Sequence, residues 1–437
     1  MTDMTGTMDN AAAGGCPFHF PSRSFDPLND EFWANPWPIL EKLQKEAPVF
    51  YSPELDFWIV TRHEDVRKCF LDNKSFSAAI TIAPMRPLTD ETIASFEKSG
   101  FRDGPSLVNE DSATHKARRA RLSRQFEVAK INAMEPFIRQ TVTRYLDRIV
   151  KKGEADLMKD FIYDIPLLVV FHLLGLPDDE LKKVKKWAGD TALLCWGRPE
   201  PHQQKAMADA LGEYWAFAKK YVAHKKVNPG DDLISLAIQG QREEGEEIWS
   251  DEYLFRLLLN FTFAGHETTT NAAGNAVMNL LLDRKLWEQI VADPAGIPNA
   301  VNELLRVGSS IIAWRRKALV DVELSGVKIP AGSNIMMYNG AANRDPEVFA
   351  DPQTIDLQRD NTNKMLSFGF GPHLCLGNPL ARLEMRVMLE ELVRRLPQVE
   401  LVPQSFTFSP MNCNARGPDH IMTRWDPHAN PVPADRP

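Results

Sequence analysis

The segment 368–377 constrains this chain more than any other part of its sequence. It runs Phe-Gly-Phe-Gly-Pro-His-Leu-Cys-Leu-Gly and places a single cysteine, Cys375, in a loop punctuated by glycines. A helical pattern begins directly after it, near Asn378. A cysteine that only fills core space needs no glycines beside it, whereas a thiolate that binds a large flat group needs a tightly folded backbone that offers N–H groups to sulfur. We therefore interpret Cys375 as a metal-ligating thiolate.

This loop resembles the haem-binding loop of the cytochrome P450 family, the haem-thiolate monooxygenases. The resemblance implies that Cys375 ligates the iron of haem b (iron protoporphyrin IX) and that Phe368, Gly369 and Gly377 lie against the cofactor. The helix that follows would stabilise the anionic sulfur with the positive end of its dipole. For a cysteine outside such a loop, a buried structural thiol would be the better interpretation.

Composition narrows the class of protein. The chain has 437 residues, of which 43% are hydrophobic and 25% charged, so it can form a core large enough to enclose a cofactor. Its net charge of −8 argues against nucleic acid as a partner. The five widely spaced cysteines form neither a disulfide framework nor a CxxC pattern, which fits a reducing compartment. No segment has the length and hydropathy of a membrane span, and the N-terminus lacks a signal-peptide pattern. We expect a cytoplasmic protein.

Helical periodicity dominates the chain. Apolar residues at three- and four-residue spacing predict helices over 31–45, 129–152, 179–194, 207–224, 251–282 and 379–396. Short β-branched and aromatic runs predict strands over 49–51, 57–60, 317–322, 334–338 and 421–424. The fold class is therefore mainly α with small β-sheets (α+β). Because the motifs must converge on one cofactor, we expect one haem-enclosing domain over 25–427, after a disordered segment 1–24 and before a Pro-rich tail or linker 428–437.

A second motif lies in the predicted helix 251–282. Gly265 interrupts an apolar helix, at a cost of about 0.5–1 kcal/mol relative to Ala, so we expect a ligand against that face. The segment 264–269 resembles the oxygen-activating segment of the family. The resemblance implies that Ala264 contacts the haem, that Thr268 hydrogen-bonds dioxygen and that Glu267 supplies protons from solvent. We expect His266 to be structural. Taken alone, the hexapeptide would suit an exposed Glu and a back-bonding Thr.

Charged residues elsewhere suggest supporting roles. Glu303 and Arg306 share a helix face at i, i+3 and resemble the structural Glu–Arg pair of the family, which Arg359 would join. The two haem propionates need cationic partners. By resemblance these are His115, Arg119, Arg316 and His373, with Arg315 as the rival of Arg316, since neighbouring strand residues point to opposite faces.

The chain has no cluster-binding cysteine spacing and no Gly-rich dinucleotide motif, so electrons must come from elsewhere. Several segments resemble the haem domain of the bacterial self-sufficient class, which carries a fused reductase. This implies an NAD(P)H-dependent reductase with FMN and a [2Fe-2S] cluster, either separate or fused C-terminally. A candidate docking patch consists of Lys116, Arg118, Arg121, Arg124 and Arg386, although such a cluster is commonly just a solvated face.

The expected function is dioxygen-dependent hydroxylation or O-dealkylation of small hydrophobic substrates, in particular aromatic or alkyl-aryl compounds. By resemblance the pocket includes Ile82, Leu194, Trp196, Ile312 and Met411, which are apolar. Two alternatives are a peroxide-driven haem peroxygenase, which would usually lack the acid–alcohol pair, and a haem-based sensor, which needs no proton relay. We expect a monomer.

Overall fold

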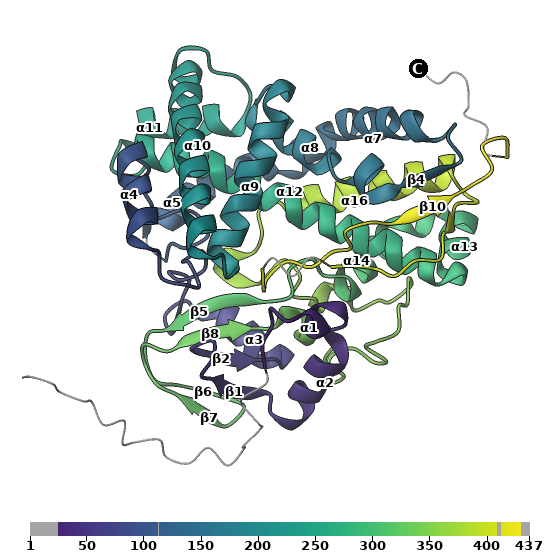
Figure 1. Ribbon diagram of the computed structural model, residues 1–437, viewed down its shortest axis with the longest axis horizontal. Helices are drawn as coiled ribbons and strands as arrows, with labels where there is room; N and C mark the ends of the chain where they lie inside the picture. Colours follow the sequence, from purple (N-terminus) through teal and green to yellow (C-terminus); the bar gives the residue numbers. More distant parts are fainter. Residues whose placement is uncertain (1–24, 112, 409–411, 430–437) are drawn as a thin grey trace, which may run out of the picture.

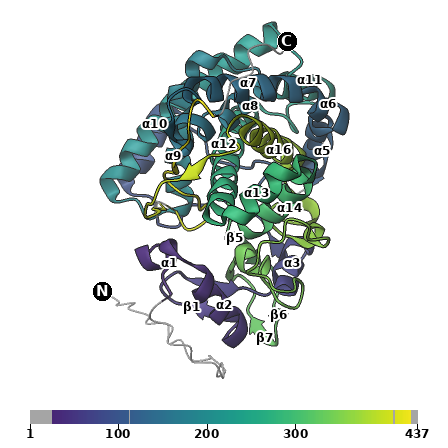
Figure 2. The same cartoon turned by 90° about the vertical axis from the view of Figure 1, so that its right-hand side faces the viewer.

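Long helices form most of the structure, and the strands of the largest sheet gather along one side (Figures 1 and 2). The computed structural model describes residues 25–111, 113–408 and 412–429. The segment 1–24, which we expected to be disordered, and the tail from residue 430 lie outside the described residues. No helix in the described ranges has the length and apolar character that a membrane crossing requires.

The helices are α1 (Asp30–Ala34), α2 (Trp37–Glu46), α3 (His63–Leu71), α4 (Asp90–Ser99), α5 (Ala113–Leu122), α6 (Val128–Ala133), α7 (Glu135–Ile149), α8 (Ile165–Leu174), α9 (Leu181–Trp196), α10 (Pro201–Val227), α11 (Leu233–Glu244), α12 (Asp251–Leu282), α13 (Arg284–Ala292), α14 (Ile297–Val307), α15 (Asn339–Ala342) and α16 (Asn378–Arg395). Short 3-10 turns and one π turn, η2 (Met158–Ile162), connect some of them. The strands are β1 (Val49–Ser52), β2 (Phe57–Val60), β3 (Phe76–Ser77), β4 (Glu154–Asp156), β5 (Trp314–Ala318), β6 (Val322–Leu324), β7 (Val327–Ile329), β8 (Asn334–Met337), β9 (Glu400–Leu401) and β10 (Met422–Arg424).

The largest sheet joins the two halves of the chain. Its strand order is β1-β2-β8-β5-β3, so strands near the N-terminus flank a pair formed more than 230 residues later. β8 runs parallel to β2 and antiparallel to β5, with Trp58 opposite Ile335 and Arg316 opposite the same residue from the other side. β4, β10 and β9 form a second sheet, and β6 and β7 form a hairpin. The predicted strand ranges gave no sign that the early and late strands pair in one sheet.

Proline positions explain where the predicted helices divide. The predicted helix 31–45 is two helices, α1 and α2, because the chain leaves the helical conformation at Asn35, before Pro36. The predicted helix 129–152 likewise divides into α6 and α7, since Pro136 has no N–H to continue the hydrogen bonding of α6. The prediction for 251–282 is confirmed, because α12 has the same bounds.

The bounds predicted for the strand 317–322 are wrong. β5 begins at Trp314 and ends at Ala318, and the chain turns before β6 starts at Val322. Arg315 and Arg316, in the middle of β5, are each only 1% exposed. Two adjacent arginines are typical of solvent-exposed segments, so the sequence pattern excluded two buried residues in the middle of the strand.

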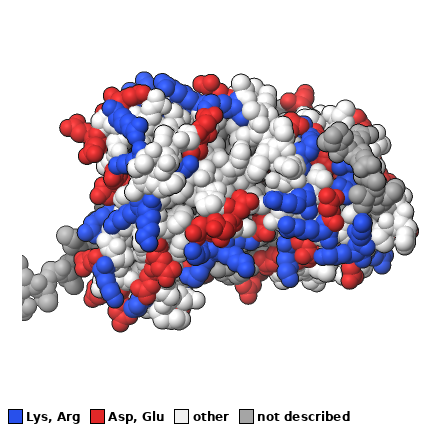
Figure 3. Space-filling model, turned by 90° about the horizontal axis from the view of Figure 1, so that it is seen from above, with Lys and Arg blue, Asp and Glu red and all other residues white. Residues whose placement is uncertain are grey.

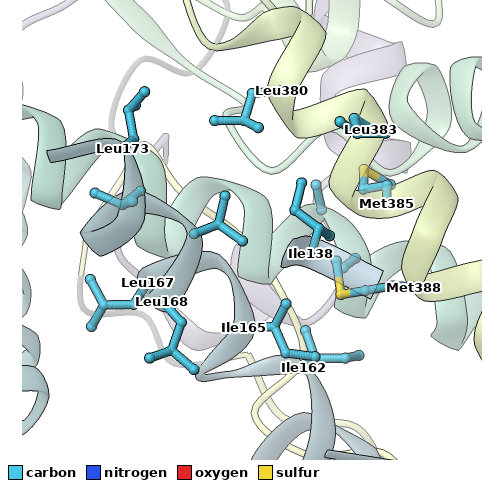
Figure 4. Close-up of a cluster of buried hydrophobic side chains, with 14 of the residues drawn as sticks. Ile138, Ile162, Ile165, Leu167, Leu168, Leu173, Leu380, Leu383, Met385 and Met388 are labelled. Atoms are coloured by element: carbon cyan, nitrogen blue, oxygen red, sulfur yellow. The ribbon is translucent and has the colours of Figure 1, made fainter. Parts of the chain in front are cut away.

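A large apolar core lies between the helices. Figure 4 shows Ile165, Leu167 and Leu168 of α8 near Leu380, Leu383 and Met388 of α16, with Ile138 of α7 beside them. α12 runs through this helical layer and contacts both α8 and α16. This packing fixes the positions of the centre of α12 and the start of α16 relative to each other.

Gly265 serves this packing. A Cβ at Gly265 would lie 2.4 Å from Cγ2 of Val170 on α8, which is far inside van der Waals contact. The sequence interpretation, that Gly265 leaves room for a ligand, is therefore wrong: the glycine lets α8 approach α12 closely.

We predict that Gly265→Ala lowers the free energy of unfolding by about 1–2 kcal/mol, because the overpacking against the stiff Val170 side chain outweighs the gain in helix propensity. The matched control is Gly189→Ala in α9, where the added Cβ would meet its nearest neighbour at an ordinary 3.6 Å. That variant should be stabilised by about 0.5–1 kcal/mol. Urea denaturation followed by circular dichroism measures both; equal shifts for the two variants would contradict the packing role.

Candidate functional site

The loop before α16 is held in a conformation that requires glycine. Gly369 and Gly371 have φ angles of 69° and 70°, in the left-handed region. A Cβ at Gly371 would also come within 2.9 Å of the backbone oxygen of Phe70 on α3. The Cys375 amide donates to the Phe368 carbonyl oxygen at 2.9 Å, which closes the loop. The glycines thus fix the position from which the cysteine side chain leaves the backbone.

Four groups around the Cys375 thiol favour its anion, but desolvation outweighs them and the pKa of the thiol is raised. Desolvation raises the pKa of Cys375, while the backbone N–H groups of Gly377 and Asn378 and the guanidinium groups of Arg119 and Arg382 act to lower that pKa. Gly377 is the N-cap of α16, so the helix dipole adds to the same effect. Cys375 is nevertheless exposed, in contrast to the other described cysteines, which are buried: Cys69, Cys195 and Cys413.

Two histidines and an arginine gather beside this loop. Arg119 of α5 donates to the backbone oxygen of Leu374, next to the cysteine. The rings of His115 and His373 stack with their centroids 4.4 Å apart, and His373 Nε2 lies 3.5 Å from an Asp111 oxygen. Burial, and then the charges of His373 and Arg119, lower the pKa of His115 to about 4. With this lowered pKa, His115 is mainly neutral near pH 7 in the structure and can take part in hydrogen bonds.

Arg315 and Arg316 point to different surroundings. Arg316 Nη1 contacts the Thr81 hydroxyl at 3.3 Å and the Arg315 carbonyl at 2.9 Å, while its Nη2 is buried and has no hydrogen-bond partner among the described residues. Asp111 is the acid whose charge acts to raise the pKa of Arg316. Arg315 instead bonds to the carbonyls of Thr81 and Cys195. Arg316 therefore lies on the side of Asp111, together with His373, and offers an open donor.

The middle of α12 presents one exposed position between half-buried and buried ones. Ala264 is exposed, and the Thr268 hydroxyl donates to its carbonyl oxygen at 2.6 Å. Burial raises the pKa of Glu267 to about 7, so this carboxyl is partly protonated at neutral pH. His266 is buried, contacts the Tyr163 carbonyl oxygen at 3.1 Å through Nε2, and has its pKa lowered to about 4 chiefly by burial. These contacts suit a structural role for His266.

The Glu303–Arg306 pair is fully enclosed. Two parallel bonds of 2.7 and 2.8 Å join the carboxylate to the guanidinium, and neither side chain has exposed area. Arg359 Nε and the Asp356 amide reach the same Glu303 oxygen at 3.1 and 3.0 Å. The predicted participation of Arg359 is thus what the structure shows.

Asn343 connects this ion-pair network to the cysteine loop, and the sequence analysis missed it. Its carbonyl accepts from Arg306 at 2.8 Å, and its side chain receives the Leu366 amide at 2.6 Å and donates to the Ser367 hydroxyl at 2.8 Å. Ser367 in turn donates to the Leu305 carbonyl at 2.9 Å. The buried amide of Asn343 makes bonds to residues more than 20 positions away, which no local sequence pattern reveals.

Three of the predicted pocket residues share one apolar cluster. Trp196 and Ile312 are buried there, and the half-buried Ile82 packs against them. Leu194 lies on another face of α9 and belongs to the helical core, so its placement in the pocket is not supported. Met411 lies outside the described residues.

The candidate docking patch is largely neutralised. Arg118 pairs with Glu110, Arg121 with Glu243 and Glu244, and Arg386 with Glu135 and Glu390; Lys116 and Arg124 are exposed. The face seen in Figure 3 similarly mixes acidic and basic residues. The prediction of a five-residue basic patch is therefore wrong.

Comparisons with known proteins agree with this geometry. The family model described as Cytochrome P450 matches residues 33–293 and 297–410. Cytochrome P450(MEG) of Priestia megaterium is 30% identical over 381 residues, which cover 87% of this chain and 90% of that protein. The solved structure of an intact type IV self-sufficient cytochrome P450 monooxygenase has 40% identity and a TM-score of 0.91; the match covers 96% of this chain but 55% of that one. The structure of cytochrome P450 CREJ in complex with (4-ethylphenyl) dihydrogen phosphate has 32% identity and a TM-score of 0.88, covering 93% and 100%. The chain belongs to the cytochrome P450 family of monooxygenases.

Proposed function

We propose that this chain binds haem b through the Cys375 thiolate and uses dioxygen to hydroxylate or O-dealkylate small hydrophobic substrates. The observation that carries the proposal is the position of Cys375, an exposed residue at the N-terminus of α16. Backbone N–H groups and two guanidinium groups act on its thiol in favour of the anion that iron requires, against the desolvation that raises its pKa. The other described cysteines have none of this exposure.

The residues around the thiol suit a haem. Arg316 offers a buried guanidinium nitrogen that has no partner in the described part of the chain, and an anionic propionate would satisfy it. Arg119, His115 and His373 gather on the α5 side of the cysteine loop and would hold the propionates together with Arg316. Phe368, Gly369 and Gly377 belong to the loop itself, and Ala264 would face the other side of the ring.

When bound, the haem would supply the activation of dioxygen. The protein would contribute the placement of hydrogen bonds and protons. The Thr268 hydroxyl, which otherwise donates to the Ala264 carbonyl, would turn to hydrogen-bond the oxygen. Glu267, with a pKa of about 7, can hold a proton at neutral pH and exchange it with water. This acid–alcohol pair favours dioxygen over peroxide as the oxidant.

The apolar cluster of Trp196, Ile312 and Ile82 suits an aromatic or alkyl-aryl substrate. The complex of the relative CREJ with an alkylphenyl phosphate supports this class. Electrons would come from an NAD(P)H-dependent reductase with FMN and a [2Fe-2S] cluster, separate or fused. The similarity to a self-sufficient monooxygenase, of which this chain spans about half, supports that class of donor.

We predict that Thr268→Ala keeps haem content and substrate affinity but diverts most reducing equivalents to peroxide, because a positioned hydroxyl is lost. The measurement is product and peroxide formed per NAD(P)H consumed, with the alkyl-aryl compound that gives the largest ferric spin shift in a screen. The matched control is Thr262→Ala on the same helix, which also removes a back-bonding but buried hydroxyl. Unchanged coupling in Thr268→Ala would refute its role.

We predict that the product yield per NAD(P)H falls as the pH rises through about 7, because Glu267 is protonated below that value and has no proton to give above it. In Glu267→Gln this alkaline limb should disappear, and the yield should be low at every pH. A profile from pH 5.5 to 8.5 in both proteins, at saturating reductase, measures the effect. Retention of the limb in Glu267→Gln would assign it to another group.

We predict that Glu303→Ala lowers haem content and destabilises the fold by about 3–5 kcal/mol, because it leaves two buried guanidinium groups without their carboxylate. Glu288→Ala, which breaks the exposed Arg284–Glu288 pair, is the control and should change stability by less than about 1 kcal/mol. Haem per protein and chemical denaturation report the result. A fully haem-loaded but slow Glu303→Ala enzyme would contradict the structural role.

A further inference from the structure

Arg315 is a buried guanidinium whose contacts serve none of the roles described above. It is 1% exposed, and its Nη2 donates to the Thr81 carbonyl at 2.8 Å and to the Cys195 carbonyl at 3.1 Å. Its guanidinium carbon lies 3.8 Å from the centroid of the Trp196 ring. Arg315 therefore binds the last residues of α9 from a position in the central sheet.

The contacts join segments that are far apart in the chain. Thr81 lies in the irregular segment after β3, Cys195 and Trp196 end α9, and Arg315 is in β5. Trp196 also lies 5.6 Å from Trp314, ring to ring, and its carbonyl accepts the Cys413 amide at 3.0 Å. The helix then ends at Gly197, after which the chain turns towards α10. Besides its apolar packing, the end of α9 is therefore tied to distant segments by these contacts, two of which come from Arg315.

The charge of Arg315 is not balanced by an acid. Among the described residues its guanidinium contacts only carbonyl oxygens and an aromatic ring, and its Nε is buried without a partner. Arg306, by contrast, is paired with a carboxylate and has carbonyl partners for its remaining N–H groups. Burial lowers the pKa of Arg315 to about 10, which reflects the free-energy cost of burying its charge without an acid as partner. Carbonyl oxygens and a ring hold the guanidinium less firmly than a carboxylate would, so the contact can open reversibly.

The surroundings show what an opening would uncover. Trp196 belongs to the same apolar cluster as Ile312 and Ile82, where the proposed function places the substrate. With Arg315 engaged, Trp196 is 1% exposed and the end of α9 covers this cluster. Separation of Trp196 from Arg315 would expose the cluster to solvent beside the segment that contains Thr81.

We infer that Arg315 is a latch that fastens the end of α9 over the substrate pocket, so that its release controls the entry and exit of small hydrophobic molecules. This inference rests on the proposed function for the location of the pocket. It also gives Arg315 a role distinct from that of Arg316, which keeps the open donor on the side of Asp111.

The test measures ligand exchange in the haem-loaded ferric protein. The probe is 4-phenylimidazole, whose binding to the iron is followed by stopped-flow absorbance, with cyanide as a small ligand that needs no opening. In Arg315→Met, both the binding and the release rate of 4-phenylimidazole should rise about tenfold, because one cation–π contact and two hydrogen bonds are lost. Its equilibrium affinity and the cyanide rates should change by less than about twofold. Arg315→Lys should lie between the two proteins.

Hydrogen–deuterium exchange gives a readout independent of the iron. The amides of residues 193–197 should exchange faster in Arg315→Met, while those of residues 366–377 stay unchanged. The matched control is Arg344→Met, which removes another buried guanidinium stacked on a tryptophan, 4.0 Å from the Trp37 ring. It should not alter 4-phenylimidazole rates. If Arg315→Met fails to fold, Trp196→Leu removes the same contact from the other side, and the double variant should be no faster than either single one.

Unchanged 4-phenylimidazole rates together with unchanged exchange at 193–197 would overturn the latch. A fall in haem content in Arg315→Met with normal rates in the remaining loaded protein would also overturn it and make Arg315 a propionate ligand. Failure of the proposed function has a different appearance: the wild-type protein would then bind neither haem nor either ligand.

Discussion

The thiol side of the protein depends on the buried ion pairs and hydrogen bonds of the Glu303 carboxylate. It is shared by Arg306, Arg359 and a backbone amide, and the Glu303–Arg306 pair has no contact with solvent. A buried ion pair repays its desolvation only when every polar atom finds a partner. Arg306 meets that condition by binding carbonyl oxygens, including that of Asn343. Through Asn343 the same network fixes the residues immediately before the cysteine loop. The hydrogen bonds that satisfy the buried charges of Glu303 and Arg306 thus also help to position that loop.

Three buried arginines show how partners decide the use of one residue type. Arg306 is saturated by a carboxylate and carbonyls and acts as a permanent support. Arg316 keeps one donor open, which suits an anion that arrives with the cofactor. Within the described residues Arg315 has only carbonyls and a ring as partners, which it can exchange for water at little cost. Their different roles therefore follow from what each guanidinium lacks as much as from what it binds.

The sequence predicted those features that are encoded locally. The bounds of α12 follow from its own periodicity, and the i, i+3 spacing of Glu303 and Arg306 already implied a shared face. Features that depend on a distant partner were missed. The clash that Gly265 avoids is with another helix, the burial of β5 comes from strands far away in the chain, and the arginines of the supposed docking patch meet acids that only the fold brings near. The assignment of residues to the haem remains a prediction.

The strand order of the central sheet has a consequence for folding during synthesis of the chain. β1 and β2 leave the ribosome early, but β8, the parallel neighbour of β2, is made more than 270 residues later. Parallel pairing over such a separation is slow, and exposed strand edges invite aggregation during the wait. Because the cysteine loop follows β8, its sulfur emerges only when the sheet can close. Completion of the sheet and binding of the proposed cofactor would therefore both wait until the segment from β8 to the cysteine loop has been made.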